Sequence, residues 1–406
     1  MVRAWAQMRA EGLALADEYV KSHAFLHDDT WLDLEGDRDE VSGHPLLLPE
    51  APLVLTSKAA PVFPDGGGKI SPAVVRMPPG ARSPLAQLSE SDEEIDRLAA
   101  GLAMNRLDIS AFYADRVELE KIKKAVEQRG GKCAIHPSPE HYRHHEDHRF
   151  NLGALAAAAD RWPRTRVCWS ADQAADAFDD FGPAVFCKKR DSRTVRVTTR
   201  GQLEFYSATE GYPLVVQEGV AARSSPVFHW ITFNGVRRPL FVLRQILHQA
   251  HHVGNVYEPA YEKHIVSRFA DVMRRCLELL PLDWVGFAGV DLIETANGAD
   301  LIPIDLNARF NSSTIPFLSV LGPDQGRVRA GHGAVVYLRH ETSFRPAHLK
   351  AMAETVSPVV AESTTWFGES PGQREQVIFS LTESADSPSS VVRSMRGIVA
   401  AAGCHQ

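Results

Sequence analysis

The sequence predicts an α/β protein built from several lobes, and three observations support this fold class. A chain of 406 residues is too long for one simple core, so two to four subdomains are expected. Hydrophobic residues make up 44% and charged residues 23%, which is typical of a globular protein. From about residue 102 onward, strand patterns and helical patterns follow one another along the chain.

Composition also excludes several classes of protein. The net charge of −7 gives no general attraction to nucleic acid or to an anionic membrane. No apolar run approaches the roughly 20 residues that cross a bilayer, and the first residues lack the apolar core of a signal peptide. The five cysteines are scattered without a CxxC pair, which favours reduced thiols. We therefore expect a cytoplasmic protein with no nucleic-acid or membrane partner.

The first third of the chain predicts an opening helix and, later, one β-α-β unit. Between the two, acidic and Pro- and Gly-rich sequence gives no clear element. The unit consists of a strand in 105–114, an amphipathic helix over 117–130 that ends in Gly-Gly, and a strand at 132–136.

The rest of the chain alternates short strands with helices. Helices are expected at 141–162, at 171–182 with Ser170 as N-cap, and at 259–280, where one apolar stripe runs from Ile265 to Leu280. Strands are expected at 164–170, 184–190, 194–199 and 213–220, at 226–247 around a turn at Asn234-Gly235, and in a hairpin at 286–310. Two C-terminal strands, at 334–340 and 376–384, and a helix near 389–402 suggest a small closing α/β lobe.

The hairpin at 286–310 carries an unusual set of polar residues. Asp305, Asn307 and Arg309 alternate with apolar residues, so in a strand their side chains point to one face. An ordinary half-solvated strand would show the same alternation. The preceding strand, however, carries another acid, Asp291.

If the hairpin folds symmetrically about Gly298, Asp291 lies directly opposite Asp305. Like charges so placed destabilise a sheet, unless a cation lies between them or one acid is held protonated. Asn307 adds a neutral oxygen, and such hard ligands are those that Mg²⁺ prefers. Arg309 follows and can hold a transferring phosphoryl group or a developing anion. A register slipped by one residue would separate the two acids.

The segments GVDLIE and LIPIDLNARFNSS resemble the metal-binding hairpin of the ATP-grasp superfamily. There an Asp and a Glu-x-Asn on the next strand hold two Mg²⁺ ions that bridge the ATP phosphates. The resemblance implies Asp291, Asp305 and Asn307 as metal ligands and Arg309 as a catalytic residue, matching an Arg of the biotin-carboxylase-like branch. Asp305 departs from the usual Glu, which would shift the metal. Gly289 stands where the D-alanine-ligase branch carries a catalytic Arg.

Further segments resemble the parts that hold ATP in this family. GPAVFCKKRDS resembles the strand with a phosphate-binding lysine, and Lys188 is the match, with Lys189 on the other face; an exposed strand end is the alternative. EDHRFNLGAL lies where the family has an Asp-Lys opening a helix. Arg149 replaces that lysine and is expected to meet a phosphate, unless it is only a solvated helix charge.

PLVVQEGVAA resembles the hinge that pairs with adenine, which implies that Gln217, Glu218 and Val220 flank the base; a plain strand end is the alternative. The loop after Lys188, RDSRTVRV, lacks the glycines with which the family wraps the triphosphate. Side chains of residues 192–194 are candidates to contact the phosphates instead.

The resemblance implies an ATP-grasp architecture of class α/β (α+β). We expect an N-terminal α/β pre-ATP-grasp region at 1–135 and a small lobe at 136–215. A large lobe at 216–330 would carry the metal site on an antiparallel sheet and clasp ATP against the small lobe. The C-terminal α/β lobe would span 331–406.

Two histidine clusters and one glycine run are weaker signals. His141, His144, His145 and His148 stand at helical spacing, which fits a transition-metal site but more often a solvated face. His248, His251 and His252 follow Arg244, in a region where ATP-grasp enzymes gather substrate groups. Arg244 is therefore a second candidate catalytic residue, against a loop with polar residues. The run at 66–69 lacks the spacing of a P-loop and predicts a flexible loop.

The resemblance implies an ATP-dependent carboxylate–amine ligase that uses ATP and two Mg²⁺ ions. Its partners would be a small-molecule carboxylate and an amine, joined through an acylphosphate with release of ADP and phosphate, in specialised amino-acid or peptide biosynthesis. An ATP-grasp kinase, a ligase that uses a thiol or bicarbonate, and a nucleotide-binding protein without turnover remain alternatives. Whether the N-terminal region binds substrate, closes over the site or forms a homodimer stays open.

Overall fold

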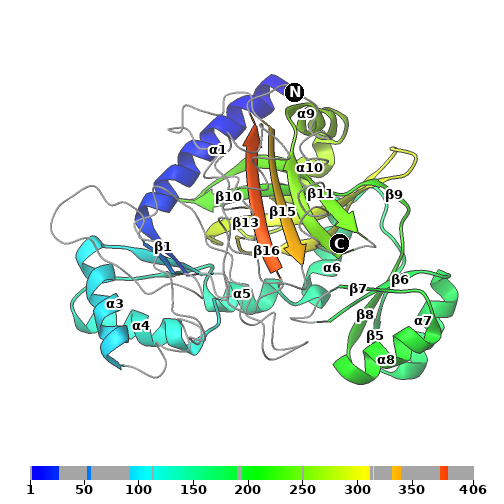
Figure 1. Cartoon of the computed structure of the whole chain (residues 1–406), viewed down its shortest axis with the longest axis horizontal. Coiled ribbons are helices and arrows are strands. Elements are labelled where there is room, and N and C mark those ends of the chain that lie inside the picture. The colour runs from blue at the N-terminus through cyan, green and yellow to red at the C-terminus, as the bar shows by residue number, and fades with distance from the viewer. Residues whose placement is uncertain are drawn as a thin grey trace.

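The computed structural model describes residues 2–26, 53–55, 92–111, 114–189, 194–248, 251–310, 314, 332–339 and 375–382. These residues form three sheets: a parallel N-terminal sheet, a small antiparallel sheet and a large antiparallel sheet between them (Figure 1). The predicted α/β class with an antiparallel sheet is confirmed. None of the helices in these ranges is long and apolar enough to cross a membrane.

The N-terminal sheet has the strand order β2-β1-β3-β4, and all its pairings are parallel. The predicted β-α-β unit is β3, α4 and β4, and the buried face of α4 carries Leu119, Ile122 and Val126. The elements are α1 (Val2–Ser22), β1 (His23–Leu26), β2 (Leu53–Leu55), α3 (Asp92–Asn105), β3 (Asp108–Ala111), α4 (Val117–Gln128) and β4 (Ile135–His136).

The small sheet has the strand order β5-β8-β6-β7 and is covered by two helices. Ser170 caps the first of them as predicted, since its side chain accepts from the amide of Gln173. The second helix was not predicted: Thr199 caps it, and Leu203 and Tyr206 pack under it. The elements are β5 (Thr165–Cys168), α7 (Ala171–Phe181), β6 (Val185–Lys188), β7 (Val195–Val197), α8 (Arg200–Glu210) and β8 (Leu214–Glu218).

The large sheet has the strand order β14-β13-β10-β11-β12-β15-β16, with β9 paired to β13. Its strands are β9 (Ala222–Ser224), β10 (Pro226–Phe233), β11 (Val236–His248), β12 (His251–Tyr257), β13 (Gly286–Thr295), β14 (Leu301–Asn307), β15 (His332–Arg339) and β16 (Glu375–Thr382). Two expectations change here. Residues 251–257 form a strand rather than a polar loop, and the two C-terminal strands extend the large sheet instead of standing in a lobe of their own. The helix expected near 389–402 and the glycine run at 66–69 lie outside the described ranges.

Two helices that were predicted as continuous are split. The stretch at 141–162 becomes α5 (Pro139–His145) and α6 (His148–Ala158), because Asp147 caps α6 by accepting from the amide of Arg149. The stretch at 259–280 becomes α9 (Pro259–Arg268) and α10 (Ala270–Leu277), broken where Phe269 leaves the helical region with φ −124° and ψ 33°. Its predicted apolar stripe is nevertheless buried.

The large sheet carries an apolar cluster on each face. On one face α9 and α10 cover side chains such as Phe228 and Leu292. On the other face α1 and the N-terminal sheet meet side chains such as Val227 and Phe287. α1 crosses β11 so closely that a Cβ atom at Gly12 would lie 2.1 Å from the carbonyl oxygen of Pro239. The polar face of the β13–β14 hairpin lies on this second side.

The turn between β13 and β14 depends on Gly298, whose φ is +66°. We expect Gly298→Ala to lower the free energy of unfolding by about 1 kcal/mol, because a left-handed conformation strains any residue with a Cβ atom. The atom nearest to a Cβ atom at position 298 is the end of the Arg223 side chain, 3.0 Å away, and this flexible side chain can move. Urea unfolding would measure the loss.

Gly153→Ala in α6 is the matched control, because Gly153 has open space around it and sits in a helix. This control should leave stability unchanged or raise it by up to about 1 kcal/mol. Equal stability of both variants would contradict the strain at Gly298.

Candidate active site

Asp291 and Asp305 lie directly opposite each other on β13 and β14, as predicted. The hairpin is not symmetric, however. Close to the turn Glu294 pairs with Leu301, and continuing this register would set Asp291 against Ile304 and turn Asp305 to the other face. A bulge adds Ile304 as an extra residue and shifts the register by one, so that the two carboxylates share a face.

The bulge also supplies a contact to the small sheet. The ammonium group of Lys188, at the end of β6, donates to the carbonyl oxygen of Ile304. The side chain of Lys188 is buried, with 3% exposed. Lys189 points the other way, with its Nζ atom 3.9 Å from Glu210 at the end of α8. Lys188 is thus the lysine that faces the hairpin.

The two facing carboxylates have opposite electrostatic character. Burial, and then the neighbouring Asp305, raise the pKa of Asp291 to about 7. Burial acts in the same direction on Asp305, but the charges of His148, Lys188 and Arg309 outweigh it and hold the pKa of Asp305 well below its usual range. The pair therefore binds one proton readily, or a cation in its place.

Residues between α5 and α6 reach the same face of the hairpin. His148 Nδ1 lies 3.0 Å from Asp305 Oδ1. Arg309 Nε donates to Glu146 Oε2 at 3.3 Å, and the other oxygen, Oε1, is buried without a hydrogen-bond partner. Burial raises the pKa of Glu146, which Arg309 opposes. The sequence predicts neither Glu146 nor His148 at this site, because its helical pattern runs through residues 141–162 and gives no sign of the break between α5 and α6.

Arg244 does not lie with the carboxylates. Asp291, Val227 and Leu243 form one row across β13, β10 and β11, and the alternation of a strand turns Arg244 to the opposite face. There Arg244 pairs with Glu258. Arg244 therefore lies away from the carboxylates, and its role as a catalytic residue stays a prediction.

The next residue on β11, Gln245, is the one that points to the carboxylates. Its side chain hydrogen-bonds to Asp291, and its Oε1 atom accepts from Ser225 Oγ at 2.6 Å. The face that Gln245 occupies follows from the pairing of β10 with β13, which no local pattern in the sequence reveals.

The chemistry of these donors fits a hard divalent cation. Asp291, Asp305 and Asn307 share one half-buried face, and Asn307 stands opposite Gly289, which has no side chain to crowd it. All three offer oxygen ligands, and the repulsion between two carboxylates is relieved by a positive ion between them.

Arg149 is engaged at the start of α6. Its guanidinium group pairs with Asp147, the cap of the same helix, and lies 6.0 Å from the centre of the Trp169 ring. Trp169 follows β5, so Arg149 reaches from α6 toward the small sheet. Among the described residues Arg149 contacts Asp147, Phe150 and Trp169, and its phosphate role stays a prediction.

The segment predicted as the adenine hinge links the small sheet to the large one. Gln217 Nε2 donates to Thr165 Oγ1 at 3.1 Å, and the Glu218 carboxylate pairs with Arg164 at 2.9 Å. The backbone amides of Glu218 and Gly219 already donate to the carbonyl oxygens of Arg164 and Ala184. The predicted backbone pairing with adenine would therefore use the linker around Val220. The side chains of Gln217 and Glu218 hold the strand end together, and the predicted place of Gln217, Glu218 and Val220 beside adenine stays a prediction.

Some predicted contacts fall on parts that the structure does not describe. Residues 190–193 of the glycine-free loop are among them, and so are the side chains of His248, His251 and His252. In the other histidine cluster, His148 turns to Asp305. The ring of His144 stacks on Phe150 at 4.6 Å and lies 4.9 Å from the ring of His145.

Comparison with solved structures identifies the fold. An L-amino acid ligase from Bacillus licheniformis superposes with a TM-score of 0.56 at 12% identity, over 92% of this chain and 96% of that one. The chain has an ATP-grasp fold.

Other ATP-grasp structures match a shorter part of the chain. An N5-carboxyaminoimidazole synthase from Aspergillus clavatus, in complex with ADP and 5-aminoimidazole ribonucleotide, gives a TM-score of 0.54 at 13% identity over 78% of this chain and 89% of that one. The N5-carboxyaminoimidazole synthetase from Staphylococcus aureus, in complex with ADP, gives a TM-score of 0.52 at 11% identity, over 76% of this chain and 83% of that one. No family model and no curated protein sequence matches the chain.

The raised pKa of Asp291 predicts a pH-dependent stability in the absence of divalent cations. Between pH 3.8 and about 7, folded Asp291 keeps a proton that the unfolded chain has released, so this carboxyl lowers stability as pH rises through that window. Asp291→Asn should therefore gain stability over the parent chain at about pH 8, on the order of 1 kcal/mol, and much less at about pH 5. Urea unfolding of Asp291→Asn and of the parent chain, with a chelator present, measures the stability difference at each of the two pH values.

Asp300→Asn removes an equal charge from the same hairpin and is the matched control, since Asp300 lies by the turn. It should show no such difference between the two pH values. A stability offset of Asp291→Asn that is the same at both would contradict the raised pKa.

Proposed function

We propose that this protein is an ATP-dependent carboxylate–amine ligase that forms an amide or peptide bond. The observation that carries the proposal is the facing pair Asp291 and Asp305, with Lys188 of the small sheet reaching the bulge beside it. Two carboxylates and an amide on one hairpin, with a buried lysine that reaches the hairpin from the small sheet, suit the binding of a polyphosphate and its cation. The ATP-grasp fold supports nucleotide binding between the two antiparallel sheets.

Asp291, Asp305 and Asn307 would hold Mg²⁺ in this proposal. When bound, Mg²⁺ neutralises phosphate charge and helps align an in-line phosphoryl transfer. Lys188 would exchange the carbonyl of Ile304 for phosphate oxygens. Arg309, oriented by Glu146, would stabilise the transferring phosphoryl group or the oxyanion that develops later.

The proposed reaction has two displacements. A substrate carboxylate oxygen attacks the γ-phosphorus of ATP, ADP leaves, and an acylphosphate remains. An amine then attacks the acyl carbon, loses a proton and expels phosphate. The small and large sheets would exclude water from the acylphosphate, which hydrolyses easily.

An amino acid is the favoured carboxylate. The matched L-amino acid ligase covers 92% of this chain, against 78% for the Aspergillus clavatus carboxyaminoimidazole synthase. This supports an amino-acid or peptide product over a carboxylated amine, and a role in specialised biosynthesis. The cysteines that the structure describes are free and buried, which fits a reducing compartment such as the cytoplasm.

Nucleotide product analysis tests the proposal directly. The protein is incubated with ATP, Mg²⁺ and pools of amino acids and other amines, and ADP plus phosphate is resolved from AMP plus pyrophosphate. Release of ADP and phosphate that needs both an acid and an amine is the expected result. Formation of AMP would overturn the acylphosphate route. Release of ADP that depends on an alcohol or a thiol would point to a kinase or a thioester ligase. Binding of ATP without hydrolysis would point to a nucleotide-binding protein without turnover.

Lys188→Met should weaken the binding of Mg-ATP by roughly tenfold or more, because an ammonium group that faces the phosphates is lost. Lys189→Met is the matched control, since Lys189 points to α8, and it should bind ATP nearly as the parent chain does. Calorimetric titration of both variants measures the difference. Equal affinities would assign the phosphate lysine elsewhere.

Asp305→Asn should reduce turnover by about 100-fold or more while the protein stays folded, because a metal ligand is weakened but carboxylate repulsion is relieved. Asp300→Asn, in the turn of the same hairpin, should keep nearly full activity. Steady-state ADP release and circular dichroism are the measurements. Full activity of Asp305→Asn would exclude Asp305 as a metal ligand.

A further inference from the structure

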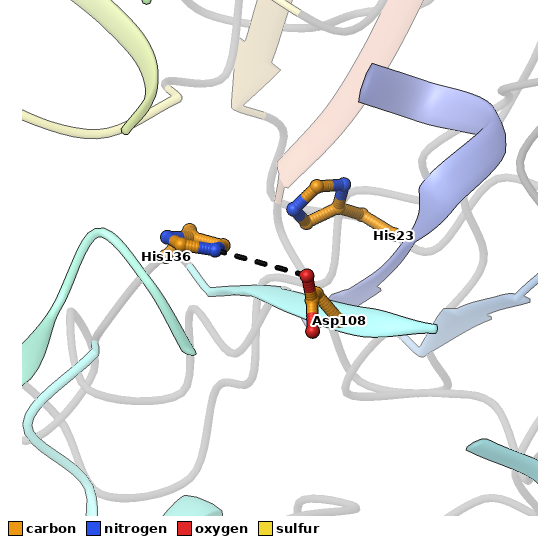
Figure 2. A group of neighbouring side chains, drawn as sticks. All are labelled: His23, Asp108 and His136. Atoms are coloured by element: carbon orange, nitrogen blue, oxygen red, sulfur yellow. Dashed lines mark ion pairs between the residues drawn. The ribbon is translucent and has the colours of Figure 1, made fainter. Parts of the chain in front are cut away.

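Three side chains at one end of the N-terminal sheet converge on a common point. His23 begins β1, Asp108 begins β3, and His136 ends β4 (Figure 2). His23 pairs with Asp108 and His136 with Ser110 across parallel strands, so the three side chains lie on the same face of the sheet. Their ligand atoms all lie within 4.8 Å of one another, and among the described ranges this is the one such group of three His, Cys, Asp or Glu residues.

The tautomer of His23 follows from its surroundings. Its Nδ1 atom lies 2.7 Å from the backbone carbonyl oxygen of Tyr19, which can only accept, so Nδ1 carries the proton. The lone pair of the neutral ring therefore resides on Nε2. Burial is the main cause that lowers the pKa of His23 to about 3, so the ring remains neutral. A backbone carbonyl that fixes the tautomer in this way is typical of histidines that bind metal.

The Nε2 atom of His23 is a buried polar group without a partner. His23 is 0% exposed, and Nε2 has no hydrogen-bond partner. Figure 2 shows the ring with one nitrogen turned toward Asp108 and His136. An unsatisfied buried acceptor lowers the stability of the fold. A ligand at this point would remove that cost.

Asp108 and His136 complete a set of donors. Asp108 Oδ1 accepts from the amide of Ala134 at 2.7 Å, which holds the carboxylate in place and leaves Oδ2 directed to His136 Nε2, 3.9 Å away. Their side chains are 39% and 19% exposed. His136 also lines a cavity of about 250 Å³. An ion therefore has a path to the cluster from solvent.

The spacing is close to what a metal ion requires. With bonds of about 2.0–2.2 Å, donor atoms around a tetrahedral ion are about 3.3 Å apart. The pair of Asp108 and His136 would need to close by roughly half an ångström, and a pair at the 4.8 Å limit of the cluster by about 1.5 Å. Rotation of the two partly exposed side chains, Asp108 and His136, would supply these movements.

We propose that His23, Asp108 and His136 bind a divalent transition-metal ion such as Zn²⁺. Two imidazoles and one carboxylate form a donor set that suits Zn²⁺ and its neighbours in the periodic table, in contrast to the oxygen donors of the β13–β14 hairpin. Three protein ligands leave a further coordination position for water or a small ligand. The ion would join β1, β3 and β4 and, through the Tyr19 carbonyl, the end of α1. The site is separate from the proposed ligase chemistry and does not rest on it.

The test uses the full chain, freed of metal by a chelator and titrated with Zn²⁺ alone, without nucleotide. Calorimetry should detect about one equivalent bound at this site, and Zn²⁺ should raise the melting temperature. His136→Gln and Asp108→Asn should each weaken binding by roughly tenfold or more. His141→Gln is the matched control: His141 lies on α5 and lines the same cavity but is no member of the cluster, and the control should bind Zn²⁺ normally.

Absence of binding by the parent chain would overturn the proposal, and so would undiminished binding by His136→Gln and Asp108→Asn. Loss of binding in His141→Gln would place the ion at the α5 histidine instead and would also overturn it. Anomalous diffraction from a Zn²⁺-soaked crystal of the parent chain locates the ion without any variant. A peak between the three side chains is expected, and a peak elsewhere alone would refute the site.

Discussion

Two carboxylates that face each other on neighbouring strands repel, and much of the local structure around Asp291 and Asp305 is organised by that repulsion. Burial increases it, because water can no longer screen the charges. His148, Lys188 and Arg309 keep Asp305 ionised, while the same burial leaves Asp291 ready to take a proton. The metal-free hairpin is thus held in a state that a divalent cation would relieve.

The groups that meet at this hairpin come from three separate parts of the chain. Lys188 reaches it from the small sheet, Gln245 from a neighbouring strand of the large sheet, and Glu146 and His148 from the junction of α5 and α6. Figure 1 shows α5 and α6 running below the large sheet, between the two outer sheets. The break between these helices therefore matters for the site, because a continuous helix would not offer both side chains to β14.

The sequence predicted the hairpin pair because polar residues with a period of two and a turn at Gly298 are local signals. The bulge at Ile304 was not predictable in this way: symmetric counting reached the right pair although the register near the turn differs by one. Alternation and resemblance predict Lys188 as the phosphate-binding lysine, with Lys189 on the other face; in the structure Lys188 contacts the hairpin, and its phosphate role stays a prediction. The face that Arg244 occupies relative to the carboxylates depends on the pairing of β10 with β13, a contact between segments distant in the sequence, so no local pattern reveals it. No local pattern relates His23 to His136 either, because the pairing of β1 and β4 with β3 brings together residues far apart in the chain. The roles of the hairpin residues, the hinge and Arg149 in binding ATP remain predictions.

The position of α1 has a consequence for how the chain is made. Arg9 pairs with Tyr257 and Glu262, which lie 248 and 253 residues later, and Glu11 pairs with Arg238. At a synthesis rate of about 5–20 residues per second, the partners of α1 leave the ribosome on the order of 10–50 s after the helix itself. During that interval Trp5 and Tyr19 have no large sheet to pack against. Helix α1 thus finds its place only after residues more than 200 positions later have been made, and until then the nascent chain carries the apolar surface of this helix exposed.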